Sequence, residues 1–199
     1  MSDRSPLPDP QEILAFWFGE PGSPEHGQPR PLWFQKSDAV DREIGQRFGA
    51  RVEQALAGEL LDWASTPDGA LARVLLLDQF TRNIFRDTPR AFAGDTQGLA
   101  AAQAMVATGQ DQALPPFQRG FVYLPYEHSE SLAMQDEAVR LFTVLAATGA
   151  PGAESMLDYA HRHRAVIVHF GRFPHRNDIL GRPSSPEELA FLQEPGSRF

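Results

Sequence analysis

Apolar side chains recur along this chain with the spacing of helices rather than that of strands. In the segment that opens at Asp38, apolar residues stand at every fourth position: Val40, Ile44, Phe48, Val52 and Leu56. This spacing places them on one face of a helix with 3.6 residues per turn, so we expect a long amphipathic helix. No run of alternating apolar and polar residues with a hairpin dipeptide is present, and such a run would indicate a β-hairpin.

Capping signals divide the rest of the chain into further helices. Asp9-Pro10-Gln11-Glu12 combines a capping aspartate, proline at the first helical position and glutamate three residues after the cap. It predicts a helix over residues 10–18 that ends at Gly19. Ser185-Pro186-Glu187-Glu188 repeats the pattern and predicts a last helix to about residue 193. Further helices are expected from Thr66-Pro67, over 96–108, from Pro116 to a stop at Pro125, over 129–148 with Ser129 as cap, and over 153–170.

Together these signals predict an all-α fold with eight or nine helices. At 199 residues, one domain spanning 1–199 is the default. Residues 1–9 are polar and proline-rich, and we expect them to be flexible. Residues 19–32 are rich in proline and glycine and are expected to form a loop. A helical array of the tetratricopeptide type, a right-handed superhelix, is the specific arrangement expected.

The composition excludes several chemical groups and indicates where in the cell the protein is expected. The chain lacks cysteine, which excludes disulfides, thiolate nucleophiles and cysteine metal ligands. The longest apolar runs, 74–77 and 165–168, are far shorter than the ~20 residues that span a bilayer. No signal sequence is evident near the N-terminus. We therefore expect a soluble, cytoplasmic protein with no membrane partner.

The charge distribution is uneven. The net charge of −8 argues against a nucleic-acid partner. Residues 158–182 nevertheless hold five arginines, two aspartates and four of the six histidines, so this segment carries +3 and the remainder −11. Motifs of P-loop NTPases, dinucleotide enzymes, zinc proteases and α/β-hydrolases are absent. With Lys36 as the only lysine, Schiff-base chemistry is not expected.

Three polar segments are candidates for chemistry. In the first, Asp78 and Arg82 are four residues apart and share a helix face, and Asn83 and Arg86 extend it. In the second, Glu127 and His128 form a possible acid–base pair, followed by Glu130. The third runs from His161 to Arg182 and contributes five candidate ligand-binding or acid–base residues: His161, Arg172, His175, Arg176 and Asn177.

Charge complementarity predicts that the three segments meet in one pocket. Buried guanidinium groups require carboxylates, solvent or an anionic ligand as partners. Asp78, Glu127 and Glu130 are the acids that the first two segments offer. In particular, Asp78, Arg82, His128 and Arg172 are expected in one polar cluster. His169 lies in an apolar run, where a core histidine bonded to a carbonyl group is the expected role.

The same segments resemble a known family. The runs Leu77-Asp78-Gln79-Phe80-x-Arg82-Asn83-x-Phe85-Arg86, Leu124-Pro125-x-x-His128-Ser129-Glu130 and Gly171-Arg172-Phe173-Pro174-His175-Arg176-Asn177 are similar to those of the bacterial domain-of-unknown-function family numbered nine hundred and twenty-four. The likeness extends from Ile13 to Arg182. Thr81 departs from it, where proline is expected. The resemblance implies a tetratricopeptide-like superhelix and assigns no activity, cofactor or site residue.

Three functional hypotheses follow. The first is a pocket for a small anionic or polar ligand, in which the arginines bind charge and Glu127, His128 and His175 exchange protons. The second is a protein-interaction module, as helical superhelices often are. The third is a metal site built from Glu127, His128, Glu130 and either His161 or His175, although no histidine pair has the spacing of a helical zinc site. The sequence identifies neither a cofactor nor an oligomeric state.

Overall fold

In the computed structural model, which describes residues 7–198, every regular element is a helix. The all-α prediction is confirmed for this range, whereas the prediction for residues 1–9 falls largely outside it. The tetratricopeptide-like superhelix and the single-domain boundary stay predictions. The α-helices are α1 (Pro10–Phe18), α2 (Asp38–Leu56), α3 (Pro67–Leu75), α4 (Thr81–Ile84), α5 (Asp95–Thr108), α6 (Pro116–Glu127), α7 (Leu132–Ala146), α8 (Ala153–Phe170) and α9 (Pro186–Phe191).

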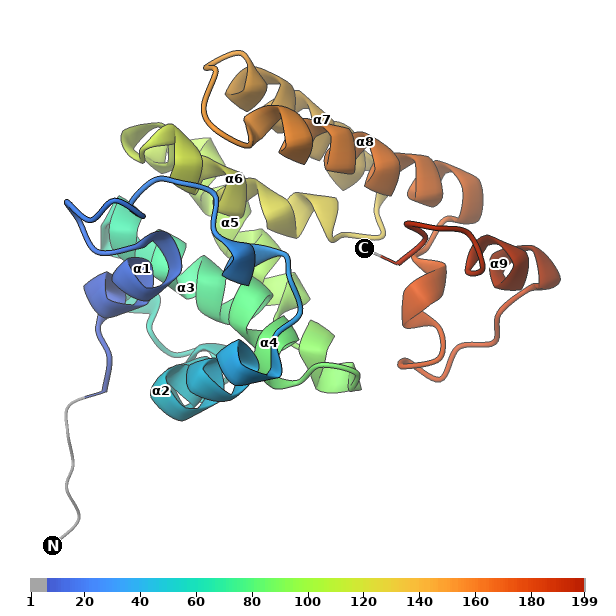
Figure 1. Cartoon of the computed structure of the whole chain (residues 1–199), viewed down its shortest axis with the longest axis horizontal. Helices are drawn as coiled ribbons and strands as arrows, with labels where there is room; N and C mark the ends of the chain where they lie inside the picture. The colour runs from blue at the N-terminus through green and yellow to red at the C-terminus, as the bar shows by residue number, and fades with distance from the viewer. Residues whose placement is uncertain (1–6, 199) are drawn as a thin grey trace, which may run out of the picture.

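The helices pack in chain order into a continuous body (Figure 1). Helices α1 to α4 form one end, and α7 and α8 lie side by side at the other, joined by a short turn. Helix α6 packs between α5 and α7. Helix α9 lies beyond the C-terminal end of α8, and the chain then turns back toward the centre of the molecule.

Both predicted capping boxes are present. The Asp9 side chain accepts a hydrogen bond of 3.0 Å from the Glu12 backbone, and the Glu12 side chain accepts one from the Asp9 backbone. Ser185 and Glu188 make the same reciprocal pair at α9. Because these bonds satisfy backbone donors that a helix start leaves open, each cap is expected to contribute ~1 kcal/mol.

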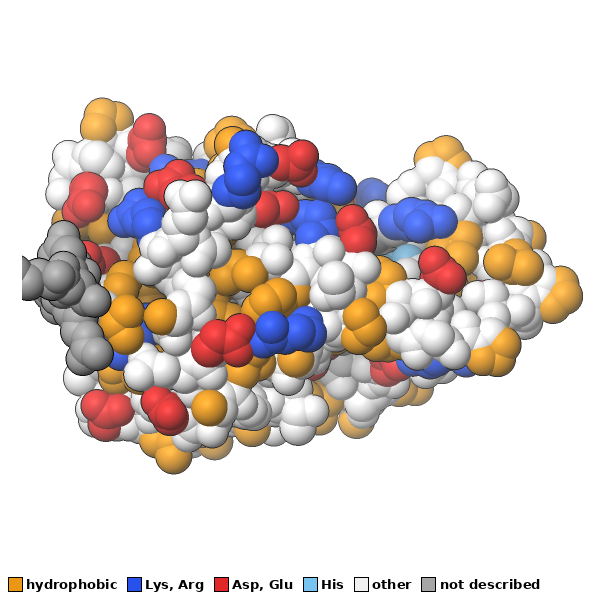
Figure 2. All heavy atoms as spheres, turned by 90° about the horizontal axis from the view of Figure 1, so that it is seen from below, with side chains coloured by type: hydrophobic (Ala, Val, Ile, Leu, Met, Phe, Trp, Pro, Cys, Tyr) orange, Lys and Arg blue, Asp and Glu red, His pale blue; other side chains and the backbone are white. Residues whose placement is uncertain are grey.

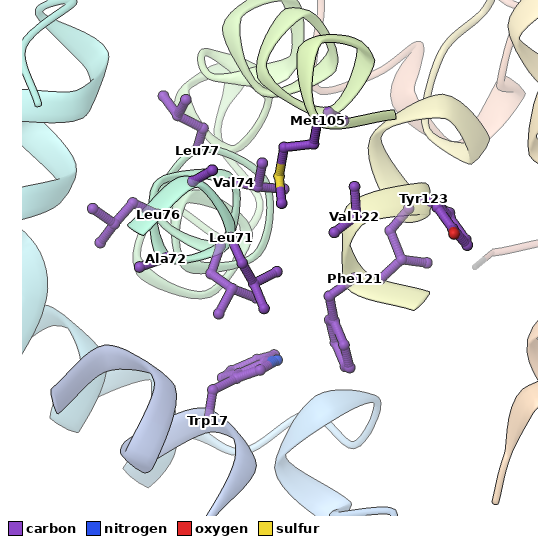
Figure 3. Packing of buried hydrophobic residues seen from close by; sticks show 14 of the residues in the cluster. Trp17, Leu71, Ala72, Val74, Leu76, Leu77, Met105, Phe121, Val122 and Tyr123 are labelled. Carbon is purple, nitrogen blue, oxygen red and sulfur yellow. The ribbon is translucent and has the colours of Figure 1, made fainter. Parts of the chain in front are cut away.

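The core forms around α3, which is apolar on nearly all sides. Leu71 and residues 74–77, which run into the turn after α3, are fully buried, so this helix lies inside the protein. Aromatic rings from other elements surround it, and Figure 3 shows Trp17 and Phe121 directed toward Leu71. The Trp17 and Phe121 rings meet edge to face at 5.8 Å. Helix α3 is therefore a rigid base for the residues that follow it.

Several predicted helix boundaries differ from the observed ones. Helix α6 continues through Pro125 to Glu127, because a proline in the last turn removes only one hydrogen bond and this turn is buried on the core. Helix α7 begins at Leu132, three residues after Ser129, and the Ser129 hydroxyl instead accepts a hydrogen bond from the Ser131 backbone. Helices α7 and α9 end at Ala146 and Phe191, each two residues before the approximate end predicted.

One irregularity interrupts the helix that runs through residues 67–84. Between α3 and α4, residues Leu76–Phe80 form a π-helical turn that contains Asp78. The Thr81 hydroxyl donates a 2.8 Å hydrogen bond to the Leu77 carbonyl group within it. Gly94, which precedes α5, lies so close that a Cβ atom there would collide with the same carbonyl oxygen. This contact brings the start of α5 next to Asp78.

Candidate functional site

Asp78 is the most deeply buried acid of the three candidate segments. The π-helical turn presents its side chain inward, and turns of this kind are frequent at functional sites. Its carboxylate lies 2.7 Å from His128 Nδ1, 3.0 Å from Arg82 Nη1 and 2.6 Å from Gln79 Nε2. Burial alone would raise the pKa of Asp78, but the positive charge of Arg82 and the bond with His128 outweigh it and hold the pKa well below its ordinary value. Asp78 is therefore a buried, ionised carboxylate.

His128 stands at the C-terminal end of α6, where its ring faces Asp78. An ionised carboxylate only accepts hydrogen bonds, so Nδ1 of His128 carries the proton and donates it to Asp78. The Nε2 atom is thereby left as a hydrogen-bond acceptor, and no described group bonds to it. It is not one of the fully buried atoms that lack a partner, so it is open to solvent. Burial lowers the pKa of His128 despite the opposing effect of Asp78, so the ring is neutral near pH 7. A neutral imidazole oriented by a carboxylate is suited to accept a proton.

Two arginines from distant segments meet beside this pair, and we call them the arginine pair. Arg82 comes from α4 and Arg176 from the turn at residues 174–176. The Asp95 carboxylate, at the start of α5, bridges them: Oδ1 lies 2.9 Å from Arg82 Nη2 and Oδ2 lies 3.3 Å from Arg176 Nη1. Asp78, Arg82, Asp95, His128 and Arg176 thus form one connected group, here named the central polar cluster.

Arg176 is unusually enclosed for an arginine. Its guanidinium lies 4.7 Å from the Phe92 ring centre and 4.6 Å from that of Phe173, and Nη2 donates a 2.9 Å bond to the His128 carbonyl group. Its Nε atom is buried, and no described group accepts a bond from it. Burial and the neighbouring Arg82 lower the pKa of Arg176 to about 10, which still leaves it charged at neutral pH.

Glu127 and His163 form a buried pair behind the cluster. Glu127 Oε1 lies 3.1 Å from His163 Nδ1, and that nitrogen also lies 2.9 Å from the Tyr159 carbonyl oxygen. Burial, with a smaller effect of the Asp78 charge, raises the pKa of Glu127 to about 8. Burial, helped by His128, lowers the pKa of His163 to about 3. Both side chains are therefore predominantly uncharged near pH 7.

Four of the predicted site residues lie between the central polar cluster and α9: Glu130, Arg172, His175 and Asn177. Arg182 binds Glu130 through two bonds of 2.7 and 2.9 Å. Arg172 binds Glu188 in α9, so its expected place in one cluster with Asp78, Arg82 and His128 is wrong. The reason is that α9 supplies a carboxylate closer to Arg172. Asn177 donates to the Ser184 hydroxyl, and His175 is half-buried with its ring 5.6 Å from that of Phe173.

The remaining predicted residues lie elsewhere. Asn83 and Arg86 both bind Asp41 in α2, so they connect two helices outside the central polar cluster. His161 is exposed on α8. The expectation that His169 is a core histidine is wrong, because its ring is exposed and its Nε2 lies 2.9 Å from Glu187.

Three members of this region are not among the site residues predicted from the sequence. Asp95 gave only the signal of a helix start, so its contact with two arginines could not be read from the sequence. His163 stands two residues after His161, and the helical spacing from the buried Ala160 and Ile167 is the signal that could have placed it inside. Arg182 was included only as the end of a motif.

Other possible sites in the described part of the chain offer fewer groups for metal binding or proton transfer. Among residues 7–198, no group of three or more histidine or acidic side chains is arranged to hold a metal ion, so the metal hypothesis gains no support. A hollow of about 550 Å³ is lined by residues from the 24–40 segment, among them Pro24, Pro29 and Pro31, and none of the described histidines lines it. We place the candidate site at the central polar cluster instead, because the acid–base groups lie there. In Figure 2, a histidine side chain is visible in a recess beside basic side chains.

Comparison with known proteins places the chain in a family without assigning a reaction. In the part of the chain that the structure describes, no helix is long and apolar enough to cross a membrane. No curated protein matches the sequence. A solved structure of a protein of unknown function, ATU0120 from Agrobacterium tumefaciens, is 36% identical, with a TM-score of 0.80 over 92% of this chain and 96% of that one. The family model described as "Bacterial protein of unknown function (DUF924)" matches residues 13–196, and the chain belongs to this family.

Proposed function

We propose that this protein binds a small anionic or polar ligand at the central polar cluster and that His128 exchanges a proton with it. The observation that carries the proposal is the pairing of Asp78 with His128. A fully buried carboxylate fixes Nδ1 of the ring and leaves Nε2 without a described partner. Structural histidines in a protein interior usually have both ring nitrogens bonded, so an oriented ring with one open nitrogen favours a role in chemistry.

The cluster also provides positively charged side chains that can bind an anionic ligand. Arg82 and His128 each keep part of their side chain exposed, as does Asp95, so solutes reach one edge of the cluster. Guanidinium groups bind carboxylate and phosphate oxygens in a fixed, forked geometry. A ligand with such a group would bind next to His128, whose carbonyl group accepts a hydrogen bond from Arg176.

Glu127 and His175 have supporting roles in this proposal. Glu127 is buried behind His128 and holds a proton near neutral pH, which makes it a reserve of protons close to the site. Burial and the charge of Arg176 lower the pKa of His175 to about 3, so this ring is also neutral. Neither side chain is needed for binding itself.

Thermal unfolding in the presence of small anions tests the proposal. Phosphate, succinate and citrate are compared with chloride at matched ionic strength, for the wild type and for His128→Gln. Because a ligand of the folded state raises its stability by mass action, at least one anion should raise the melting temperature of the wild type and do so less in His128→Gln. The control is His169→Gln, which removes an exposed histidine outside the cluster. Equal stabilisation of all three proteins, or none in the wild type, would remove the basis of the proposal.

A further inference from the structure

Asp95 is held less tightly than Asp78, the other acid of the central polar cluster. Its Oδ1 contact with Arg82 Nη2 is close, at 2.9 Å, yet both atoms lack an aligned hydrogen bond. Its contact with Arg176 Nη1 is long, at 3.3 Å. Asp78, in contrast, makes aligned bonds of 2.6 and 2.7 Å. Asp95 therefore offsets positive charge of the arginine pair, but its hydrogen-bond geometry with both guanidinium groups is poor.

Asp95 is also the acid that could leave most easily. Its side chain is 26% exposed, whereas that of Asp78 is 1% exposed. It is the first residue of α5, where a side-chain rotation would move the carboxylate into solvent without unfolding the helix. A partly exposed carboxylate keeps some of its hydration, so its release costs less than the release of a fully buried one such as Asp78.

The place that Asp95 occupies suits a stronger anion. Arg176 is 6% exposed, and its Nε atom has no acceptor in the described part of the chain, so this guanidinium is incompletely satisfied. Helix α5 has 14 residues, and its N-cap, Gly94, offers no side chain to the backbone donors of the first turn. Such donors attract negative charge, as the helix dipole does. Arg82, Arg176 and the start of α5 therefore converge at the Asp95 carboxylate, whose hydrogen-bond geometry with both arginines is poor.

We propose that Asp95 is an internal competitor, which fills the arginine pair in the free protein and is displaced when an anionic group of the ligand binds there. This inference rests on the proposed function and adds the chemistry of the ligand, a carboxylate or a phosphate that can reach both Arg82 and Arg176. The competitor prevents the two guanidinium groups from facing each other unpaired when the site is empty. It also lowers the apparent affinity for any anion, because only the fraction of molecules with Asp95 displaced can bind.

Removal of the competing charge is the direct test. In Asp95→Asn, the arginine pair keeps its shape and loses its internal anion. Affinity for sulfate is obtained from the dependence of unfolding on sulfate concentration, with ionic strength held constant by chloride. We expect the apparent dissociation constant for sulfate to fall on the order of tenfold or more relative to the wild type. Parallel titrations with phosphate and acetate distinguish a site for tetrahedral anions from one for carboxylates.

Two further variants complete the experiment. Asp95→Asn combined with Arg176→Met should lose the gain in sulfate affinity, because one arm of the arginine pair is gone. Glu53→Gln removes the carboxylate of the exposed ion pair with Arg90 and should leave sulfate affinity at the wild-type level. If Asp95→Asn is unfolded in chloride, recovery of its fold in sulfate that is lost in the double variant with Arg176→Met supports the proposal, because sulfate also stabilises proteins without binding a site. Recovery in both variants, or failure to fold in both salts, overturns it.

The outcomes separate this inference from the proposed function. If the wild type binds an anion and Asp95→Asn binds it no more tightly, the site stands and the competitor role of Asp95 is wrong. If neither protein binds sulfate, phosphate or acetate, both the anion site and the competitor role are wrong. Equal gains in Asp95→Asn and Glu53→Gln would indicate a general effect of charge, and this result also overturns the inference.

Discussion

The carboxylate of Asp78 lies 2.7 Å from Nδ1 of His128, although 50 residues separate them in the chain. The contact depends on two local features of the fold. A π-helical turn directs Asp78 inward, and α6 continues through Pro125 so that His128 follows its last residue. Because Nδ1 of His128 donates its hydrogen bond to Asp78, the ring can form a hydrogen bond with a ligand only through Nε2.

Replacement of Asp78 by asparagine should lower the pKa of His128 further. The negative charge of Asp78 and its hydrogen bond both favour the protonated ring, whereas burial and Arg82 oppose it. Asp78→Asn removes the favourable effects and leaves the opposing ones. The measurement is an NMR titration of the imidazole Cε1 proton. Asp41→Asn, which affects the separate contact with Arg86, is the control and should leave the His128 titration unchanged. A pKa of His128 that stays constant or rises in Asp78→Asn would show that the pair is not electrostatically coupled.

Glu127 should make the protein less stable as the pH rises above neutrality. Its pKa is raised to about 8 in the folded protein, so between its ordinary value and pH 8 the folded state holds a proton that the unfolded state has lost. Stability from this group is thus complete at acid pH and declines as the pH rises toward 8. In Glu127→Gln, which mimics the protonated acid, this decline should disappear.

The pH range for this measurement follows from the neighbouring histidines. The pKa values of His163 and His175 are lowered to about 3, so these groups destabilise the protein as the pH falls below their ordinary value near 6.5. This histidine effect, to which His128 also contributes, is the same in the wild type and in Glu127→Gln, so the difference between the two proteins isolates Glu127. Between pH 6.5 and 8, the free energy of unfolding of the wild type should fall relative to Glu127→Gln by ~1.6 kcal/mol, because the slope of about 1.4 kcal/mol per pH unit halves as the pH reaches the folded-state pKa. Parallel urea titrations of both proteins give this difference, and a constant difference across the range would contradict the prediction.

The fold was largely predictable because helices are encoded by nearby residues. The capping residues Asp9 and Ser185 and the four-residue apolar spacing in α2 act within one or two turns, and the structure confirms all three. The errors occurred where tertiary packing overrides a local signal. Pro125 is the clearest case, because burial of its turn outweighs the missing hydrogen bond.

The central polar cluster was only partly predictable, since its pairs connect residues far apart in the chain. The spacing of Asp78 and Arg82 revealed their ion pair. The partner of Arg172 could not be chosen from the sequence, which offers several acids of equal charge, and only the position of α9 selects Glu188. Asp95 shows the same difficulty, because its 81-residue separation from Arg176 leaves no pattern in the sequence.

Close packing at Gly94 should be essential for the geometry of the cluster. A Cβ atom at this position would meet the Leu77 carbonyl oxygen, a backbone atom that cannot move aside. Gly94→Ala should therefore destabilise the protein by ~1–3 kcal/mol, as overpacking usually does. Gly49→Ala is the matched control. Gly49 lies in α2 with no heavy atom within 4 Å of a Cβ, so alanine there should stabilise the helix by ~0.5–1 kcal/mol. Chemical denaturation of the two variants measures both signs, and equal effects would mean that Gly94 does not fix the start of α5.

The two arginines of the pair should respond differently to replacement by methionine, which keeps much of the side-chain volume and removes the charge. Arg82→Met leaves the fully buried Asp78 without its cationic partner, although His128 and Gln79 still bond to it. Breaking a buried pair in this way costs ~3–5 kcal/mol when no other partner is left, so we expect a loss of ~2–3 kcal/mol here.

Arg176→Met should change the stability of the free protein much less. Its carboxylate partner, Asp95, is partly exposed and keeps its contact with Arg82. The substitution also removes a buried charge next to Arg82, and the methionine sulfur can contact the rings of Phe92 and Phe173 that now cover the guanidinium. These effects oppose the loss of the bond to the His128 carbonyl group, so the net change should be within ~1 kcal/mol. If the arginine pair binds anions, Arg176→Met should in addition lose the stabilisation that sulfate or phosphate gives the wild type. Denaturant titrations of both variants, with and without the anion, provide all four values. If Arg176→Met unfolds as readily as Arg82→Met, both arginines serve only to hold the fold together, and the central polar cluster is a structural network rather than a binding site.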